Sequence, residues 1–228
     1  MNSKAAIVVV TAHDGPTKRI SKASVRIPNL LEKSGKSKIV LQYRDTKAKK
    51  VRLHDVYVGM TELRRKAEFV FGFFAAHGSE RGLHGANWEL LLELQTCKQF
   101  RDAVLVLCSC LKTGRFPDEV VKLRAGTRLC VRSVIGYREK MRVPGSTFIE
   151  KLDPRFSDAL QEMIEAHVLP LLQNKSVEQA IKEIKAKLYE ILTRNCLSQE
   201  SRLVISFNIP RLQSWGDRKA RLPLVCER

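Results

Sequence analysis

Several sequence features that indicate common functions are missing from this chain of 228 residues. No apolar run approaches the roughly 18 residues that a membrane-spanning helix needs. The six cysteines show no compact disulfide spacing, and a chain of this size without a convincing export signal favours reduced thiols. No phosphate-cradling glycine loop, no paired carboxylates and no internal repeat stand out. We therefore expect a soluble, cytoplasmic protein with no membrane contact and no cofactor.

Acidic and aromatic residues are also scarce. Aromatic residues make up 7% of the chain, and 41 Lys and Arg residues outnumber 24 Asp and Glu residues, for a net charge of +17. Residues 18–52 hold twelve Lys and Arg residues but only two acids, Glu32 and Asp45. Such a basic face attracts polyanions or an acidic protein surface. Tyr43 is its only aromatic residue, so a stacking platform for single-stranded nucleic acid is not supported. A solvated or partner-docking face and a nucleic-acid-binding face both stay open.

Apolar segments alternate with amphipathic ones, and their periodicity predicts the secondary structure. The expected strands cover residues 6–11, 38–44, 51–58, 69–76, 103–109, 127–135 and 202–208. The expected helices cover residues 18–34, 61–67, 87–97, 117–124, 157–173 and 176–193. Ser176 and Gln179 read as a capping box for the last helix. The alternation predicts an α/β fold, a three-layer sandwich with a mainly parallel central sheet.

We expect residues 1–210 to form a single domain and residues 211–228 to form a C-terminal tail. The second and third expected strands would pair as a hairpin. Residues 137–154 are rich in proline, glycine and charge and are long enough for a binding loop. The strands at 69–76 and 103–109 are nearly all apolar, as expected of central strands covered on both faces. Sites in such sheets form at the carboxyl ends of the strands.

Two apolar runs end in residues that can carry chemistry. One is followed by His77 and Gly78, and the other ends in Cys108, Ser109 and Cys110. If the two strands are neighbours, an imidazole lies beside a thiol, and a nearby base generates the thiolate that attacks. His77 would act as base and acid, and the Gly78 and Cys110 amides would form an oxyanion hole. Cys108, inside the strand, is expected to behave as a small core hydrophobe.

Two other interpretations of these residues stay open. His77 would then be a structural histidine that caps a strand end. Alternatively, Cys108, Cys110 and Cys130 would bind a metal with His77 or His84, although they lack the paired Cys-x-x-Cys spacing of structural zinc. We predict no metal site. His84, in a second His-Gly pair, is expected in a loop and is not the predicted base.

The order of these motifs resembles that of caspase-like cysteine peptidases, most closely the CHAT branch, which is related to caspases, gingipains and separase. That branch typically has an apolar strand ending in His-Gly and, some thirty residues later, a strand ending in a Leu-Ser-Ala-Cys-Glu-Thr-Gly-like motif. Its counterparts here are residues 75–78 and 107–110, with Thr113-Gly114 displaced by one residue. Residues 124–128 are similar to its Ala-Gly-Ala-Arg stretch, and residues 175–180 to the start of its final helix. The resemblance spans about residues 65–192.

The resemblance implies a caspase-like fold and a cysteine endopeptidase that acts on a protein substrate. Cys110 would attack the scissile carbonyl and His77 would protonate the departing amine, with no third catalytic residue required. The residue before the cut would be selected partly by the loop after the first strand, where Asp14 would favour arginine or lysine. Asp14 as an ordinary turn residue is the alternative. Glu139 is a second pocket candidate.

The resemblance also implies a latent enzyme that a partner activates, and a role in defence. The basic face would dock the enzyme on a nucleoprotein or an acidic regulatory protein. Two rival functions stay open. One is a non-catalytic adaptor that keeps the caspase-like fold. The other is a basic nucleic-acid-binding module whose cysteine and histidine residues are structural.

Overall fold

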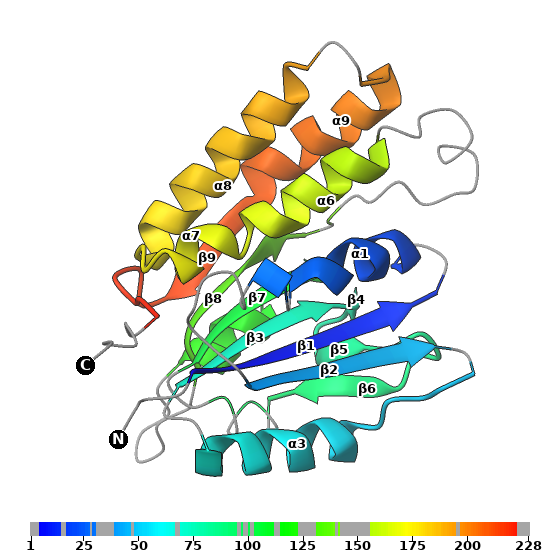
Figure 1. Ribbon diagram of the computed structural model, residues 1–228, viewed down its shortest axis with the longest axis vertical. Coiled ribbons are helices and arrows are strands. Elements are labelled where there is room, and N and C mark those ends of the chain that lie inside the picture. The colour runs from blue at the N-terminus through cyan, green and yellow to red at the C-terminus, as the bar shows by residue number, and fades with distance from the viewer. Residues whose placement is uncertain are drawn as a thin grey trace.

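A six-stranded sheet in the order β2-β1-β3-β7-β8-β9 forms the middle of the molecule (Figure 1). Its first five strands are parallel, and β9 runs antiparallel to β8 at one edge. The predicted α/β fold with a mainly parallel sheet is therefore confirmed. The strands are β1 (Ala5–His13), β2 (Ile39–Thr46), β3 (Phe69–Ala75), β7 (Ala103–Leu111), β8 (Val131–Arg138) and β9 (Leu212–Gly216).

The structure is a computed structural model of the chain. It describes residues 5–14, 17–27, 29–30, 39–46, 48–66, 69–94, 97, 100, 103–111, 115–122, 131–139, 141, 156–194 and 197–222. Most of the predicted binding loop at 137–154, the Thr113-Gly114 pair and residues 124–128 lie outside these ranges. Within the described ranges, no helix is both long and apolar enough to cross a membrane.

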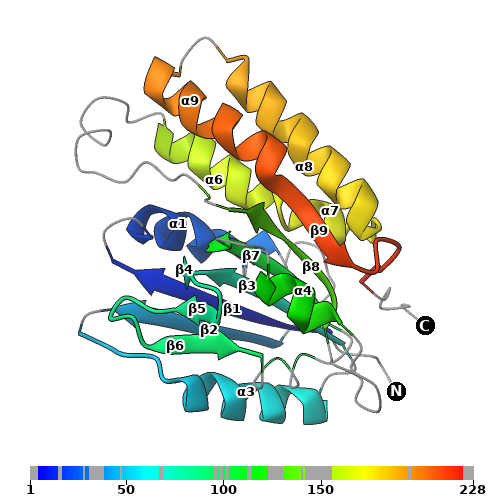
Figure 2. The same cartoon turned by 180° about the vertical axis from the view of Figure 1, so that it is seen from behind.

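Helices cover both faces of the sheet, which makes three layers (Figures 1 and 2). One face carries α1, the short helix η1, and the bundle of α6 to α9 with η3. The other face carries α3, α4 and a small three-stranded sheet of β4, β5 and β6. The first group is α1 (Lys18–Ala23), η1 (Ser24–Arg26), α6 (Phe156–Ala166), α7 (Leu169–Leu172), α8 (Val177–Leu192), α9 (Gln199–Asn208) and η3 (Ile209–Arg211). The second group is α3 (Leu53–Lys66), β4 (His77–Gly78), β5 (Gly82–His84), β6 (Leu90–Glu93) and α4 (Arg115–Val121).

The central strands are apolar throughout because both of their faces are buried. In β3, Phe73 packs in the core under the α6–α9 bundle, whereas Phe74 packs in the core under α3 and α4. In β7, Val106 packs in the same core as Phe73, and Leu107 packs in the same core as Phe74. Burial of each such side chain contributes about 1.5–3 kcal/mol. The strands predicted at 69–76 and 103–109 are thus confirmed, with both faces covered.

Gly72 occupies a position in β3 where the core leaves no room for a side chain. A Cβ there would lie 2.6 Å from Leu105 Cδ2 and 2.9 Å from a ring carbon of Phe74. We expect Gly72→Ala to lower the free energy of unfolding by roughly 1–3 kcal/mol, because overpacking strains the neighbours. Urea unfolding measures this loss. Adding Leu105→Val should recover part of it, and a fully additive double variant would contradict the proposed clash.

Three predicted elements and one predicted strand pairing are wrong. Residues 53–58 form the start of α3 rather than part of a strand, because Val56, Met60 and Leu63 are buried at helical spacing. The predicted hairpin is therefore absent, and β2 pairs in parallel with β1 instead. Residues 202–208 lie in α9, whose Ser198 cap accepts a bond from the Ser201 amide. Residues 87–97, predicted as a helix, contain β6.

The other predicted helices and strands are found with shifted ends. The predicted helix at 18–34 begins as α1 and η1, and the one at 157–173 divides into α6 and α7. The predicted capping box at Ser176 and Gln179 is present at the start of α8. The segment 211–228 contributes β9 to the sheet, and its Trp215 packs in the core beside α4. The sheet is therefore completed by residues near the end of the chain.

Candidate functional site

The carboxyl ends of β1, β3 and β7 meet at one edge of the sheet. The β3–β7 ladder pairs Phe74 with Leu107, and three further residues along each chain lead to His77 and Cys110. β4, which contains His77, contacts β7. Asp14 directly follows β1, the other neighbour of β3. The backbone thus brings the two predicted catalytic positions, and one predicted pocket residue, to the same edge.

A bulge in β7 precedes the predicted nucleophile. Along the β7–β8 ladder, Leu107 pairs with Gly136 and Cys110 pairs with the very next residue, Tyr137. Cys108 and Ser109 are therefore extra residues in β7, and such bulges re-aim the side chains that follow them. The Cys110 side chain lies outside the part of the chain whose side chains are described.

Cys108 is a core residue, as predicted. Its side chain is buried between the sheet and the α6–α9 bundle. Burial raises the pKa of the Cys108 thiol far above its usual range, because a thiolate there would lose its hydration. The thiol therefore stays protonated and is a poor nucleophile.

The His77 ring is held on its edge and on its face. Its Nε2 lies 2.8 Å from Oδ2 of Asp14, and both side chains are mostly buried. Its face stacks on Trp88, with ring centroids 4.9 Å apart and planes inclined by 18°. The other carboxylate oxygen of Asp14 accepts a hydrogen bond from the Thr17 hydroxyl. Asp14 was predicted either in a substrate pocket or in a turn, and neither prediction included this contact with His77.

The hairpin of β4 and β5 directs the backbone amide of Gly78. The Ser79 N–H donates to the Gly82 carbonyl at 2.9 Å, and Gly78 pairs with Leu83. Because hydrogen-bonded and non-hydrogen-bonded pairs alternate in antiparallel ladders, the Gly78 N–H is directed away from β5. An outward N–H at this edge is what an oxyanion hole needs.

His84 ends β5 instead of lying in a loop, so that prediction is wrong. Its Nδ1 donates to the Trp88 carbonyl at 3.1 Å, and its Nε2 accepts from the Ser79 hydroxyl at 2.7 Å. Trp88 itself has a left-handed backbone, with φ 62°, and 65% of its surface is exposed. Such a φ is unusual for a bulky residue and costs on the order of 1–3 kcal/mol. The hairpin therefore holds a strained, exposed aromatic residue against His77.

Glu139 directly follows β8, at the same edge of the sheet. Its backbone φ is 69° and its side chain is 58% exposed. Its Oε2 lies 3.4 Å from Nε of Arg211, whose guanidinium stacks over the Phe207 ring at 3.6 Å. The structure therefore places this second pocket candidate one strand beyond Cys110, beside a cation.

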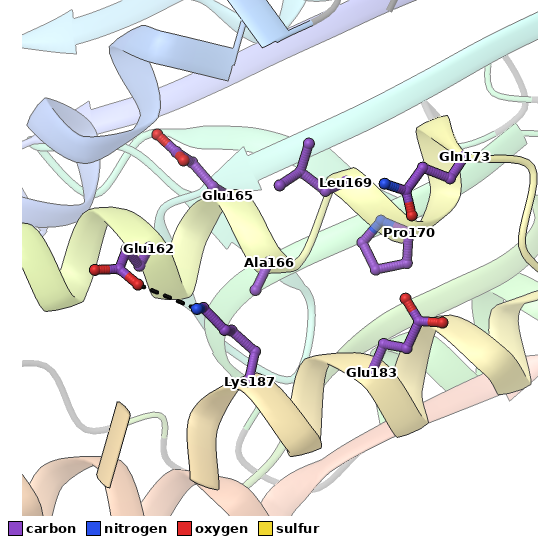
Figure 3. Close-up of a pocket in the computed structure, with 8 residues that line it drawn as sticks. All are labelled: Glu162, Glu165, Ala166, Leu169, Pro170, Gln173, Glu183 and Lys187. Carbon is purple, nitrogen blue, oxygen red and sulfur yellow. Dashed lines mark ion pairs between the residues drawn. The ribbon is translucent and has the colours of Figure 1, made fainter. Parts of the chain in front are cut away.

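A groove of about 380 Å³ lies in the helical bundle between α6, α7 and α8 (Figure 3). Its charged residues already interact with one another or with neighbours. Lys187 lies 3.4 Å from Glu162, and Arg194 binds both oxygens of Glu162, which lowers the pKa of that carboxyl. None of the predicted site residues with a described side chain lines the groove. The lining residues are Glu162, Glu165, Ala166, Leu169, Pro170, Gln173, Glu183 and Lys187.

The metal interpretation finds no additional support. Among the residues that the structure describes, no three His, Cys, Asp or Glu side chains are arranged to hold a metal ion. Cys130 and the side chain of Cys110 lie outside the described residues. The sequence matches no protein-family model and no curated protein.

Proposed function

We propose that this chain is a cysteine endopeptidase of the caspase-like, CHAT type, with Cys110 as nucleophile and His77 as general acid and base. One observation carries the proposal. The strands that lead to these two residues are parallel neighbours paired as far as Phe74 and Leu107, and β4, which contains His77, contacts β7 at the carboxyl edge. Ligand sites in parallel sheets form at that edge. The three-layer arrangement around the sheet supports a caspase-like fold.

In the proposed reaction, His77 takes the proton of the Cys110 thiol and the thiolate attacks the carbonyl carbon of the substrate. The Gly78 and Cys110 amides donate to the oxyanion that forms. The C–N bond then breaks, His77 gives its proton to the departing amine, and water hydrolyses the thioester. Proton transfer by a positioned side chain contributes typically 10²–10⁴-fold in rate, and an oxyanion donor about 10²–10³-fold.

A basic surface beside the site supports a docking partner. α1 begins four residues after Asp14 and carries the exposed Lys22, and Arg44 on β2 is also exposed. Lys49, Lys50 and Arg52 are exposed as well. We propose that an acidic regulatory protein or a nucleoprotein binds here and activates a latent enzyme. Association should weaken as salt rises, and salt-insensitive association would argue against this surface.

Active-site labelling tests the proposed reaction. The probes are acyloxymethyl ketone peptides ending in arginine, lysine or aspartate, with mass spectrometry on all six cysteines. We expect selective modification of Cys110, lost in His77→Ala. The matched control is His54→Ala, which replaces an exposed histidine on α3. Cys110 of this variant should be labelled as in the natural chain.

Two outcomes would favour the rival functions. Cys110 that stays unlabelled, with and without an added partner, would indicate an adaptor. Binding to DNA or RNA that depends steeply on salt and is unchanged by Cys110→Ala would indicate a nucleic-acid-binding module. In that module the cysteine and histidine residues would be structural.

A further inference from the structure

His77 is fixed by residues from two separate parts of the fold. Asp14 comes from the end of β1 and meets the ring edge at Nε2, 2.8 Å away. Trp88 comes from the turn between β5 and β6 and covers the ring face at 4.9 Å. A ring held on its edge and on its face has one orientation. Catalytic groups need such orientation, because a small misplacement of the reacting atoms lowers the rate.

The Asp14 contact also determines which nitrogen of His77 carries the proton. An ionised carboxylate only accepts hydrogen bonds, so the ring must donate to it through Nε2–H. A neutral imidazole carries one proton, which leaves the lone pair of Nδ1 free to accept another. Asp14 is itself fixed, because Thr17 donates to its other oxygen.

We propose, on the basis of the function proposed above, that Asp14 is a positioning residue that makes Nδ1 of His77 the proton acceptor for the Cys110 thiol. Transfer of the thiol proton to Nδ1 gives an imidazolium, whose Nε2–H still donates to the ionised Asp14 carboxylate. The proton later leaves Nδ1 for the departing amine, and Asp14 remains ionised throughout. Trp88 is the second positioning residue, since stacking on Trp88 fixes the plane of the His77 ring.

The proposal changes the role expected for Asp14. The family resemblance implied a two-residue catalytic set and placed this acid in the substrate pocket. A carboxylate bound by His77 and Thr17 has both of its oxygens engaged inside the site. Glu139 then remains as the acidic pocket candidate, at the end of β8.

Nitrogen-15 NMR of the full chain tests the proposal without requiring catalysis. With histidine labelled at its ring nitrogens, the two signals of His77 report the tautomer when the ring is neutral. Comparison with His77→Ala assigns these signals. We expect the Nε2–H form in the natural chain and loss of this preference in Asp14→Asn, whose amide can donate to Nε2. A natural chain in the Nδ1–H form would overturn the proposal, even if the variant failed to fold.

The rate of Cys110 labelling provides the second readout. Asp14→Asn should slow labelling by up to about 10⁴-fold, the loss that a wrong histidine tautomer causes in a Ser-His-Asp triad. The control Asp118→Asn, an exposed acid on α4, should change neither readout. Trp88→Ala should slow labelling roughly two- to tenfold, the value of an aromatic stack, and Trp88→Phe should restore most of that loss.

The two readouts separate this proposal from the proposed peptidase function. If Asp14→Asn loses the tautomer preference but Cys110 never labels in any chain, Asp14 positions His77 and the peptidase proposal fails. If Cys110 labels equally in the natural chain and in Asp14→Asn, the peptidase proposal stands and the role of Asp14 is overturned.

Discussion

Lowering the pH from 6.5 to 4 should destabilise the fold by on the order of 3 kcal/mol through one buried histidine. His167 is fully buried at the end of α6. Its Nδ1 donates to the Met163 carbonyl at 2.5 Å, so its Nε2 accepts from the Tyr137 hydroxyl at 2.7 Å. Burial lowers the pKa of His167 from 6.5 to about 4. A proton on Nε2 would also abolish the bond from Tyr137.

The sign follows from the difference between the folded and unfolded chains. Between pH 6.5 and pH 4, the unfolded chain binds a proton at His167 that the folded chain does not bind. Stability from this residue is therefore complete above pH 6.5 and falls as the pH approaches 4.

Urea unfolding of the natural chain and of His167→Gln, at pH 7, 5.5 and 4, measures this contribution. The natural chain should lose up to about 1.4 kcal/mol per pH unit more than the variant does. His54→Gln, at an exposed position, is the matched control and should keep the slope of the natural chain. Equal slopes for the natural chain and His167→Gln would contradict the prediction.

Tyr137→Phe should lower the free energy of unfolding by about 1–3 kcal/mol at pH 7, because Nε2 of His167 then lacks a donor.

The buried strands and the best helix could be predicted from sequence because their signals are local. The runs that became β3 and β7 are apolar on both faces, and α8 begins with a capping box and continues with buried residues at helical spacing. The two wrong strand predictions came from segments that are β-branched locally but are buried as helices. In α9, Ser201, Ile205 and Asn208 are buried at helical spacing, although the segment around them resembles a strand.

The candidate site could be predicted only in part. The strand endings predict that His77 and Cys110 share an edge, since the carboxyl ends of neighbouring parallel strands meet there. The contact of Asp14 with His77 joins residues 63 positions apart and depends on β1 lying beside β3, which no local pattern reveals. The position of Trp88 depends on a left-handed backbone at a non-glycine residue, for which the sequence offers no signal. The buried pair of Tyr137 and His167 has no periodic signature either.

Asp45→Ala should destabilise the fold by roughly 2–6 kcal/mol, because two buried backbone amides would lose their acceptor. Asp45 lies in β2 and is fully buried, although it belongs to the basic segment of the sequence. Its Oδ1 accepts from the Val51 N–H at 2.7 Å, just before α3, and its Oδ2 accepts from the Ala86 N–H at 2.5 Å. One carboxylate thus ties β2 to α3 and to the hairpin that carries Trp88. Urea unfolding of the variant measures the loss, and a loss below about 1 kcal/mol would contradict this role.

Glu89 makes this anchor sensitive to pH. Both of its carboxyl oxygens are buried and lie beside Asp45, with which they can share a hydrogen bond only if one carboxyl group is protonated. Burial and the neighbouring Asp45 raise the pKa of Glu89. For an acid with a raised pKa, the stabilisation is complete below the unfolded value and is lost as the pH rises through the folded value.

Glu89→Gln therefore should stabilise the protein at pH 7–8, because its amide donates to Asp45 at every pH, whereas the gain should shrink near pH 4. Thermal unfolding at both pH values measures the difference. In the Asp45→Ala background the same substitution should bring no gain, because the partner carboxylate is gone. A gain that persisted in that background would show that Glu89 acts independently of Asp45. A gain that disappears would show that Glu89 acts through Asp45, the carboxylate that ties the hairpin carrying Trp88 to β2.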